Sequence, residues 1–376
     1  QRRGVLPKGV YVAEAEVRSF DGSRGLVGAT NKIHVKYAAS GKAALPDDLP
    51  ATFIFKTNPG GYGGRLACLN YLNYREAQFY GDPISRSFAL GTVPNVYYAV
   101  ASPLLGEYVL VMEDVPAKRD VVPCNLIHGN QVWGVPESFT APHSSLETLE
   151  AVFLTAARIH APFWGNKEEL LAKTWMKGVG EYSEKPSFWT RVAYEKRLSQ
   201  GRRAWETTKA QLASGVDRGV KFSEGVTALL EKEMYVPFDD FKAIIDRLPC
   251  AFTHGDFHAG NMFVAKQFSG GDADIVLFDW PEAGISNPLS ELAQTLISDV
   301  RPEVMANVKD LLRTYHAELT RLGITVSYET CWEAMIVGGL TRWAWLMAIL
   351  TQFPIPAHFL QYLNDQIQAF IDLTRS

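Results

Sequence analysis

The pattern of apolar residues changes from mainly strand-like to mainly helical after residue 112, and that change limits the folds that the chain can adopt. Up to residue 112, short apolar runs alternate with charged residues and end at Gly or Pro, which is typical of strands. Further on, apolar residues recur at helical spacing, as in the predicted helix Ser145–His160. The order predicts an α+β protein with a small β-rich N-terminal domain, 1–112, and a larger, mostly helical C-terminal domain, 113–376.

The same patterns predict individual elements. We expect a helix over 69–80 that stops at Gly81-Asp82-Pro83 and follows a flexible stretch over 60–64. Residues 165–248 are predicted to be helical without strands, and 251–280 to form a strand–turn–strand unit. The predicted strands of the first domain are 10–17, 32–37, 51–56, 93–102 and 108–112.

The composition is that of an ordinary globular protein. With 376 residues, 47% of them hydrophobic, the chain can bury a core without a disulfide or zinc site. A net charge of −4 indicates neither a nucleic acid nor a membrane surface as partner. The apolar stretch Ala334–Leu350 is interrupted by Gly338, Gly339 and Arg342, so we expect a buried helix and no membrane span.

The cysteines and the first residue bear on location. Four cysteines lie far apart without a CxxC pair, which indicates a reducing compartment, and we expect a cytoplasmic location. Because the sequence opens with Gln1 and not Met, import into an organelle after removal of a targeting segment stays open.

The sharpest chemical signal is the segment HGDFHAGN, residues 254–261, followed by an apolar run that ends at Asp279. Asp256 is suited to accept or orient the proton of a hydroxyl nucleophile. Asn261 and Asp279 offer hard oxygen ligands to Mg²⁺, which bridges phosphate oxygens in phosphoryl transfer. The alternative is a solvated turn that contains an incidental Asp and Asn.

The segment also contains a His-x-Asp-x-His pattern, which suggests a metal hydrolase. No further His/Asp cluster in the sequence completes such a site. We therefore expect His254 to brace the loop through hydrogen bonds and His258 not to bind metal.

The first domain supplies residues that complement this segment. Lys56 ends an apolar strand and Glu76 lies on the following helix, the order that forms an ion pair aimed at nucleotide phosphates. Taken singly, either residue could be plain surface charge. Gly22, Gly25 and Gly28 form a turn whose backbone N–H groups could close over phosphates, although an ordinary hairpin explains them equally well.

Taken in order, these motifs resemble the kinase-like small-molecule phosphotransferases, which include aminoglycoside phosphotransferases, choline/ethanolamine kinases and ecdysteroid kinase-like proteins. The resemblance extends over nearly the whole chain, and the last group is the most similar. It rests on the segments YREAQFY (74–80), VPNVYYA (93–99), VMEDV (111–115), ARIHAPFW (157–164) and HGDFHAGNMFV (254–264).

The resemblance implies a protein-kinase-like bilobal fold with a small antiparallel β-rich N-lobe, one key helix in that lobe, and a larger helical C-lobe. It implies ATP and Mg²⁺ as cofactors and a hydroxyl of a small molecule as phosphate acceptor. The implied roles are Asp256 as the catalytic residue, Lys56 on the phosphates and paired with Glu76, Asn261 and Asp279 on Mg²⁺, and the backbone of Glu113 and Val115 against adenine.

Two departures keep other functions open. Glu291 stands where relatives carry Asp, and we expect the longer carboxylate to brace the loop less well; the segment after Asp114 also differs. Glu291 and the G-x-x-G-x-x-G spacing of Gly22, Gly25 and Gly28 keep open an alternative function, a catalytically weak or inactive kinase-fold protein that serves as a binding or structural subunit of a larger assembly. Trp280 and Glu282 could hold a cationic amine, although we favour Trp280 in the core of the C-terminal lobe.

Overall fold

The computed structural model describes residues 6–19, 29–41, 44–58, 61–71, 73–88, 90–178, 191–216, 219–271 and 273–375. The chain divides into two compact units. Unit 1 comprises 1–122 and 265–282, and unit 2 comprises 123–264 and 283–376. The predicted domain boundary after residue 112 lies before this division, and the return of residues 265–282 to unit 1 is not part of that prediction.

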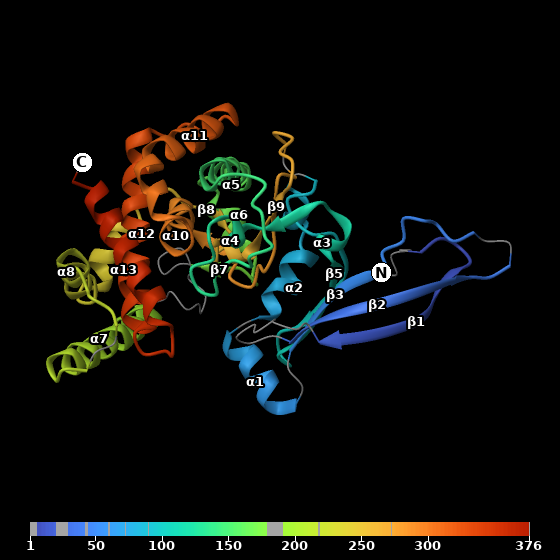
Figure 1. Ribbon diagram of the computed structural model, residues 1–376, viewed down its shortest axis with the longest axis horizontal. Coiled ribbons are helices and arrows are strands. Elements are labelled where there is room, and N and C mark those ends of the chain that lie inside the picture. Colours follow the sequence, from blue (N-terminus) through green and yellow to red (C-terminus); the bar gives the residue numbers. More distant parts are fainter. Residues whose placement is uncertain are drawn as a thin grey trace. The chain divides into compact units, whose positions relative to one another are not determined.

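Unit 1 is built on one antiparallel sheet with the strand order β1-β2-β3-β5-β4 (Figure 1). The central strand β3 pairs on one side with β2 and on the other with β5, with Lys56 opposite Thr30 and Leu110. The strands are β1 (Val10–Ser19), β2 (Ala29–Ala39), β3 (Thr52–Thr57), β4 (Val96–Ser102) and β5 (Glu107–Glu113), at the predicted places with shifted ends.

The predicted helix over 69–80 is wrong in its extent. The structure has α1 (Gly61–Tyr71) and α2 (Tyr74–Gly81) instead, so the stretch predicted to be flexible begins a helix. Glycine is a poor helix former, but tertiary contacts override this preference. Arg65 of α1 pairs with Glu107 at 2.6 Å, and Cys68 is buried against Ala77 and Tyr108.

Unit 1 also contains the segment that carries the predicted metal ligand Asp279. Within it, β10 (Ile275–Leu277) is buried, and Leu277 N donates to Thr92 O at 2.8 Å. Trp280 is fully buried, and its ring stacks on Phe79 at 4.4 Å between centroids. Because an aromatic side chain buries a large apolar area, this stack fixes the end of the segment against α2. Unit 1 also contains the 3-10 helix Pro83–Arg86 and α3 (Val115–Lys118). The strands β6 (Val121–Pro123) and β9 (Met262–Ala265) lie where the chain crosses from one unit to the other.

Unit 2 is mostly helical, so the α+β fold class with an antiparallel β-rich part and a helical part is confirmed. The predicted helix Ser145–His160 is α5, which begins with a capping box between Ser144 and Glu147. The other helices are α4 (Cys124–Ile127), α6 (Lys167–Ala172), α7 (Arg191–Ala213), α8 (Glu224–Glu233), α9 (Phe238–Ile245), α10 (Leu289–Ser298), α11 (Val308–Arg321), α12 (Tyr328–Leu350) and α13 (Ala357–Leu373). Among the described residues of the unit, the 3-10 helices are Ala161–Phe163, Ala259–Asn261 and Pro302–Asn307.

A small sheet in unit 2 corrects the prediction that 165–248 contains no strand. It has the order β7-β11-β8, formed by β7 (Lys177–Gly178), β11 (Gly284–Ser286) and β8 (Ala251–Thr253). The two-residue strand β7 is too short to leave an alternating pattern in the sequence. The sheet matters for function because β8 leads directly into the HGDFHAGN segment.

Helix α12 packs against α10 and α13 in the same unit (Figure 1). A Cβ on Gly338 would lie 2.6 Å from Ser290 Cβ, and one on Gly339 would lie 2.7 Å from Ala293 Cβ. The glycines that interrupt the apolar stretch therefore allow the two helix backbones to approach closely. By length and composition α12 is one helix that could cross a membrane, and 39% of its most apolar 18-residue window is buried.

Candidate active site

Three charged side chains meet in unit 1. Lys56, near the end of β3, places Nζ 2.9 and 3.0 Å from the two carboxylate oxygens of Glu76 on α2. The same Nζ lies 2.7 Å from Oδ1 of Asp279, which follows β10. The predicted ion pair between Lys56 and Glu76 is therefore present, and Asp279 is its third member.

Lys56 and Glu76 of this cluster are largely buried, so they are not ordinary surface charges. The side chains of Lys56 and Glu76 are 13% and 3% exposed. Burial alone would lower the pKa of Lys56, but Asp279 and Glu76 outweigh it and raise the pKa above its ordinary value. Burial, together with repulsion by Asp279, raises the pKa of Glu76, and Lys56 opposes that shift. Lys56 is accordingly held charged at a fixed position.

Asp279 has an unusual backbone and an open side chain. Its φ of 68° lies in the left-handed region that residues other than glycine seldom adopt. The side chain is 43% exposed, although it contacts the buried Lys56. A strained residue that presents a carboxylate to solvent beside a fixed lysine is typical of a functional position.

In unit 2, the HGDFHAGN segment forms a tight loop between β8 and β9. Gly255 has a φ of 84°, a conformation that favours glycine, and the 3-10 helix Ala259–Asn261 closes the loop. Asn261 Nδ2 donates to Asp256 O at 3.0 Å and lies 3.3 Å from Asp256 Oδ2. The spacing of Asp256 and Asn261 in the sequence thus brings the two side chains together.

The two histidines of this loop make local hydrogen bonds. Asp256 N donates to His254 Nδ1 at 3.3 Å, as expected for a histidine that braces the loop. Gly260 N donates to His258 Nδ1 at 3.1 Å, which leaves the ring proton of neutral His258 on Nε2. That Nε2 lies 3.5 Å from Asp256 Oδ2. His258 therefore helps to orient the carboxylate of Asp256.

Glu291 of α10, which departs from the related pattern, binds the backbone of the loop. Its Oε1 accepts from Gly255 N at 2.5 Å and its Oε2 from His254 N at 3.1 Å. Oε2 also lies 2.9 Å from His160 Nε2, and the other ring nitrogen of His160 lies 2.9 Å from Tyr315 OH. Glu291 therefore braces the loop through two backbone donors and a histidine. The comparison with the related Asp stays a prediction, which the substitution Glu291→Asp tests.

The rest of the same helix face continues this support. Gln294 Oε1 accepts from Phe257 N at 3.1 Å, and Gln294 Nε2 donates to Asp256 Oδ1 at 2.8 Å. Thr295 Oγ1 donates to Phe257 O at 2.6 Å, and Asp299, just after α10, accepts from Ala259 N at 2.9 Å. Residues three and four apart share a helix face, so α10 holds the loop along its length.

Several side chains of unit 2 orient the carboxylate of Asp256. Besides Gln294 and His258, Arg342 of α12 lies near it, with Nη2 3.7 Å from Asp256 Oδ1. Burial works to raise the pKa of Asp256, but His258, Arg342 and Gln294 outweigh it and lower the pKa well below its usual value. The carboxylate, 38% exposed, is therefore ionised at neutral pH and able to accept a hydrogen bond from a hydroxyl group.

Sequence reasoning missed Gln294 and Arg342. A helical spacing of three between Glu291 and Gln294 was visible in the sequence, but nothing in it shows which loop that face supports. Arg342 was noted only as an interruption of an apolar stretch. Its Nη1 donates to Gly255 O at 3.2 Å, which explains why a charged residue stands in that helix.

The donor chemistry of the predicted metal ligands fits a hard divalent cation. Asn261 uses Nδ2 for its bonds to Asp256, and no group among the described residues donates to its Oδ1. Asp279 presents an exposed carboxylate. Carboxylate and amide oxygens are the ligands that Mg²⁺ prefers.

The residues predicted near adenine are held by side-chain contacts within unit 1. Glu113 is buried and accepts from Arg119 at 2.8 and 2.7 Å, and from Asn95. Val115 begins α3, and the adenine contact of both backbones stays a prediction. The predicted phosphate-binding glycines Gly22, Gly25 and Gly28 lie outside the described residues.

Trp280 and Glu282 do not form a site for a cationic amine. Trp280 is fully buried and stacks on Phe79, so it lies in a core, as favoured, but in that of unit 1. Glu282 lies 3.4 Å from the buried Arg75, whose pKa burial lowers to about 10. Neither side chain is arranged to receive a ligand.

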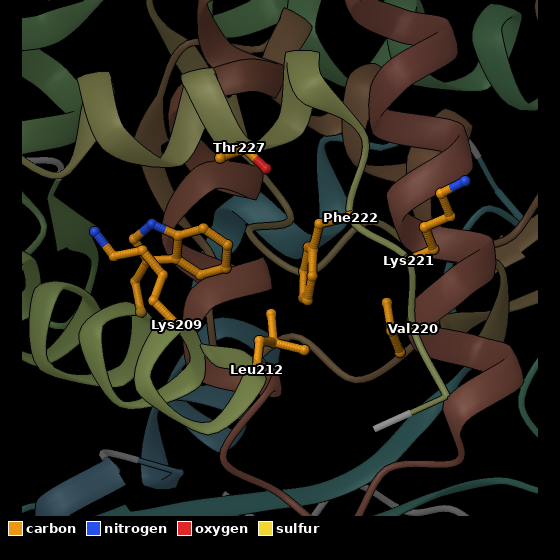
Figure 2. A pocket seen from close by; sticks show the side chains of 7 residues that line it. Lys209, Leu212, Val220, Lys221, Phe222 and Thr227 are labelled. Atoms are coloured by element: carbon orange, nitrogen blue, oxygen red, sulfur yellow. The ribbon is translucent and has the colours of Figure 1, made fainter. Parts of the chain in front are cut away.

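Unit 2 also has a cavity of about 400 Å³ between α7 and α8, shown in Figure 2. Its walls are mainly apolar, and Trp205 contacts Phe222 edge to face at 5.2 Å between ring centroids. No predicted site residue that the structure describes lines it. The lining residues are Trp205, Lys209, Leu212, Val220, Lys221, Phe222 and Thr227.

Comparison with known proteins bears on the class of enzyme. Residues 187–324 match the phosphotransferase enzyme family, and this segment includes Asp256, Asn261 and Asp279 but neither Lys56 nor Glu76. The predicted resemblance to phosphotransferases is thereby confirmed over this segment of the chain. No curated protein matches the sequence.

Several solved structures are similar at low sequence identity. The GDP complex of wild-type aminoglycoside 2′-phosphotransferase-IIIa is 11% identical, with a TM-score of 0.49 over 95% of this chain and 91% of that chain. A choline/ethanolamine kinase family protein from Mesorhizobium loti is 14% identical, with a TM-score of 0.44 over 99% and 92%. Choline kinase from Cryptosporidium parvum is 10% identical, with a TM-score of 0.46 over 96% and 90%. The substrates in these names are those of the compared proteins.

Proposed function

We propose that this protein is an ATP-dependent phosphotransferase that transfers the γ-phosphoryl group to a hydroxyl of a small molecule. The observation that carries the proposal is the buried Lys56 held between Glu76 and Asp279, with Nζ contacts of 2.9 and 2.7 Å. Phosphoryl transfer needs little covalent chemistry from the protein and depends on positioned charges. A lysine fixed in this way is suited to nucleotide phosphates.

The loop in unit 2 supplies the other half of the proposed chemistry. The acceptor oxygen forms a bond to the γ-phosphorus while the bond from phosphorus to the β–γ bridging oxygen breaks. ADP leaves, and Asp256 accepts the hydroxyl proton. Gln294 and Asn261, bonded to Asp256, hold its carboxylate in place.

Mg²⁺ is the proposed metal, held by Asn261 and Asp279, and it would neutralise phosphate charge when bound. In this proposal Lys56 orients the phosphates, and Glu76 keeps Lys56 charged and in position. Glu113 and Val115 remain the proposed backbone contacts of adenine.

The proposal is preferred over a non-catalytic scaffold because of Glu291. Its replacement of the related Asp was one of two reasons to doubt activity, the other being the spacing of the glycines at 22–28, yet Glu291 binds the loop through His254 N and Gly255 N. Among acceptors, we favour a small alcohol outside the antibiotics, because the sequence motifs are most similar to those of ecdysteroid kinase-like proteins.

Two measurements test the function. Calorimetry should detect Mg-ATP binding to the wild-type protein, and the absence of any nucleotide affinity would contradict the proposal. A screen of hydroxylated amines, sterols, sugars and aminoglycosides for ATP consumption should then identify an acceptor. A response to aminoglycosides alone would contradict the ecdysteroid kinase-like assignment and leave the reaction class intact.

A further inference from the structure

Arg342 of helix α12 lies next to the proposed catalytic residue, and Arg197 of helix α7 contacts the same helix α12. Arg342 donates to Gly255 O at 3.2 Å and lies 3.7 Å from Asp256 Oδ1. Trp345, three residues further along α12, donates from Nε1 to Arg197 O of α7 at 3.1 Å. Residues three apart share a helix face, so α7 brings Arg197 to the face that carries Arg342.

The guanidinium group of Arg197 is held between two rings. Its Cζ lies 5.6 Å from the ring centroid of Trp345 and 5.5 Å from that of Tyr194. Such contacts fix a cation without neutralising its charge. Tyr194 is in turn stacked on Phe241 at 4.5 Å, so the position of Arg197 is set by a packed aromatic cluster.

The two arginines are close enough to repel each other. Burial and the charge of Arg342 lower the pKa of Arg197 to about 9, while Tyr194 opposes the shift. Burial likewise lowers the pKa of Arg342, while Asp256 and Glu291 oppose the shift. In addition, Arg342 Nε is buried and has no hydrogen-bond partner among the described residues. An anion placed beside both groups would relieve the repulsion and could accept from Nε.

We propose that the phosphate acceptor is an alcohol that also carries an anionic group, and that Arg197 and Arg342 bind this group beside Asp256. This inference rests on the proposed function. A planar guanidinium matches the two oxygens of a carboxylate, which makes a hydroxy carboxylate the simplest acceptor. The absence of an amine site at Trp280 and Glu282 agrees with an acceptor that is not a cation.

In this proposal the anionic group belongs to the acceptor. Asp256 faces the acceptor hydroxyl in the proposed reaction, and both arginines lie in the same unit as Asp256. Lys56, proposed for the nucleotide phosphates, lies in unit 1, whereas Asn261, proposed for Mg²⁺, lies in unit 2. The Arg197→Gln variant therefore decides between the acceptor and the nucleotide.

The test uses three series of alcohols that differ in one group. The full-length protein with Mg-ATP is given 4-hydroxybutyrate, 6-hydroxyhexanoate and 12-hydroxydodecanoate, then the amino alcohols and the diols of the same chain lengths. Since charge-assisted hydrogen bonds contribute about 1.5–3 kcal/mol, kcat/KM should favour a carboxylate over its diol by about tenfold to a hundredfold. Calorimetry with the Mg-ADP complex of the protein should rank the affinities of the carboxylates, amino alcohols and diols in the same way, without turnover.

Arg197→Gln should remove the preference for carboxylates while Mg-ATP affinity stays within about twofold of wild type. The matched control is Arg191→Gln, because Arg191 also lies on α7 with its Cζ over a ring, 4.7 Å from the centroid of Phe238. That control should keep the preference.

Each contrary outcome has a separate meaning. Mg-ATP binding with equal or better use of the amino alcohols, or with no binding of any carboxylate, overturns this inference and leaves the phosphotransferase proposal standing. Arg197→Gln that weakens Mg-ATP binding and keeps the carboxylate preference also overturns it, because the anion is then a nucleotide phosphate. A wild-type protein that binds no Mg-ATP contradicts the proposed function itself.

Discussion

The charged cluster of unit 1 and the loop of unit 2 place their functional groups in different ways. In unit 1, Lys56, Glu76 and Asp279 contact one another directly, so each group is positioned by the others. In unit 2, Asp256 is positioned by side chains of neighbouring helices, chiefly Gln294 of α10. The first arrangement depends on charge, and the second depends on a scaffold of hydrogen bonds. A substitution in the cluster of unit 1 should therefore change the affinity for Mg-ATP, and one in the scaffold of unit 2 should change the orientation of Asp256.

The largest effect is expected where a charge in unit 1 is removed. Asp279→Ala should lower the affinity for Mg-ATP by about a hundredfold or more, because it removes a proposed metal ligand and a partner of Lys56. Calorimetry with and without Mg²⁺ measures the effect. The control is Asp120→Ala, which removes an exposed carboxylate of the same unit that pairs with Lys266. Unchanged metal-dependent affinity in Asp279→Ala would show that this carboxylate does not hold the metal.

Removing the anchor of the loop in unit 2 should be the next largest effect. Glu291→Ala leaves His254 N, Gly255 N and His160 without their acceptor and should cost about 2–4 kcal/mol of unfolding free energy. Denaturant unfolding measures the loss. Glu291→Asp introduces the residue of the related pattern. It should cost less unfolding free energy than Glu291→Ala, but some, because the shorter side chain reaches fewer donors. An Asp variant as stable as wild type would contradict the account of the longer carboxylate.

A smaller effect is expected when only the orientation of Asp256 is disturbed. Gln294→Leu removes the donor to Asp256 Oδ1 and should lower kcat by about tenfold, with KM for ATP unchanged. Steady-state kinetics separate the two constants. If KM for ATP rises while kcat stays constant, Gln294 acts on nucleotide binding and the comparison between the two units fails.

The smallest effect on turnover is expected at an ion pair that supports neither region directly. Arg321 and Arg158 lower the pKa of Glu318 to about 2 from an ordinary 4.5. A carboxyl group whose pKa is lowered in the folded protein stabilises the fold when the pH is above its ordinary pKa of 4.5. This stabilisation is lost as the pH falls from 4.5 to about 2. Glu318→Gln should thus cost about 1–3 kcal/mol at neutral pH and much less near pH 2, with turnover preserved. A pH-independent loss of unfolding free energy would contradict the assignment.

The two regions also differ in how far the sequence predicts them. Lys56 and Glu76 could be paired from a strand followed by a helix, because their order along the chain reflects a local arrangement. Ser145–His160 was predicted at its true ends because both the cap and the apolar spacing are local signals. In contrast, α1 forms through contacts with residues of the β4–β5 hairpin, which no local pattern reveals.

The support of Asp256 could not be predicted for the same reason. Gln294 and Arg342 are separated from Asp256 by long stretches of chain, and their roles depend on how α10 and α12 pack. The sequence predicts which residues carry the chemistry when they lie in one short motif. It does not predict which distant side chains hold that motif in place.

The substitution Asp256→Asn tests the central claim most directly, because it preserves shape and removes the charge and proton affinity of the proposed base. Mg-ATP affinity, measured by calorimetry, should persist, since Lys56, Asn261 and Asp279 remain. Turnover, measured on the acceptor found in the screen and on water as acceptor, should fall by about a hundredfold or more. Turnover equal to that of the wild-type protein would remove Asp256 from the mechanism and contradict the account.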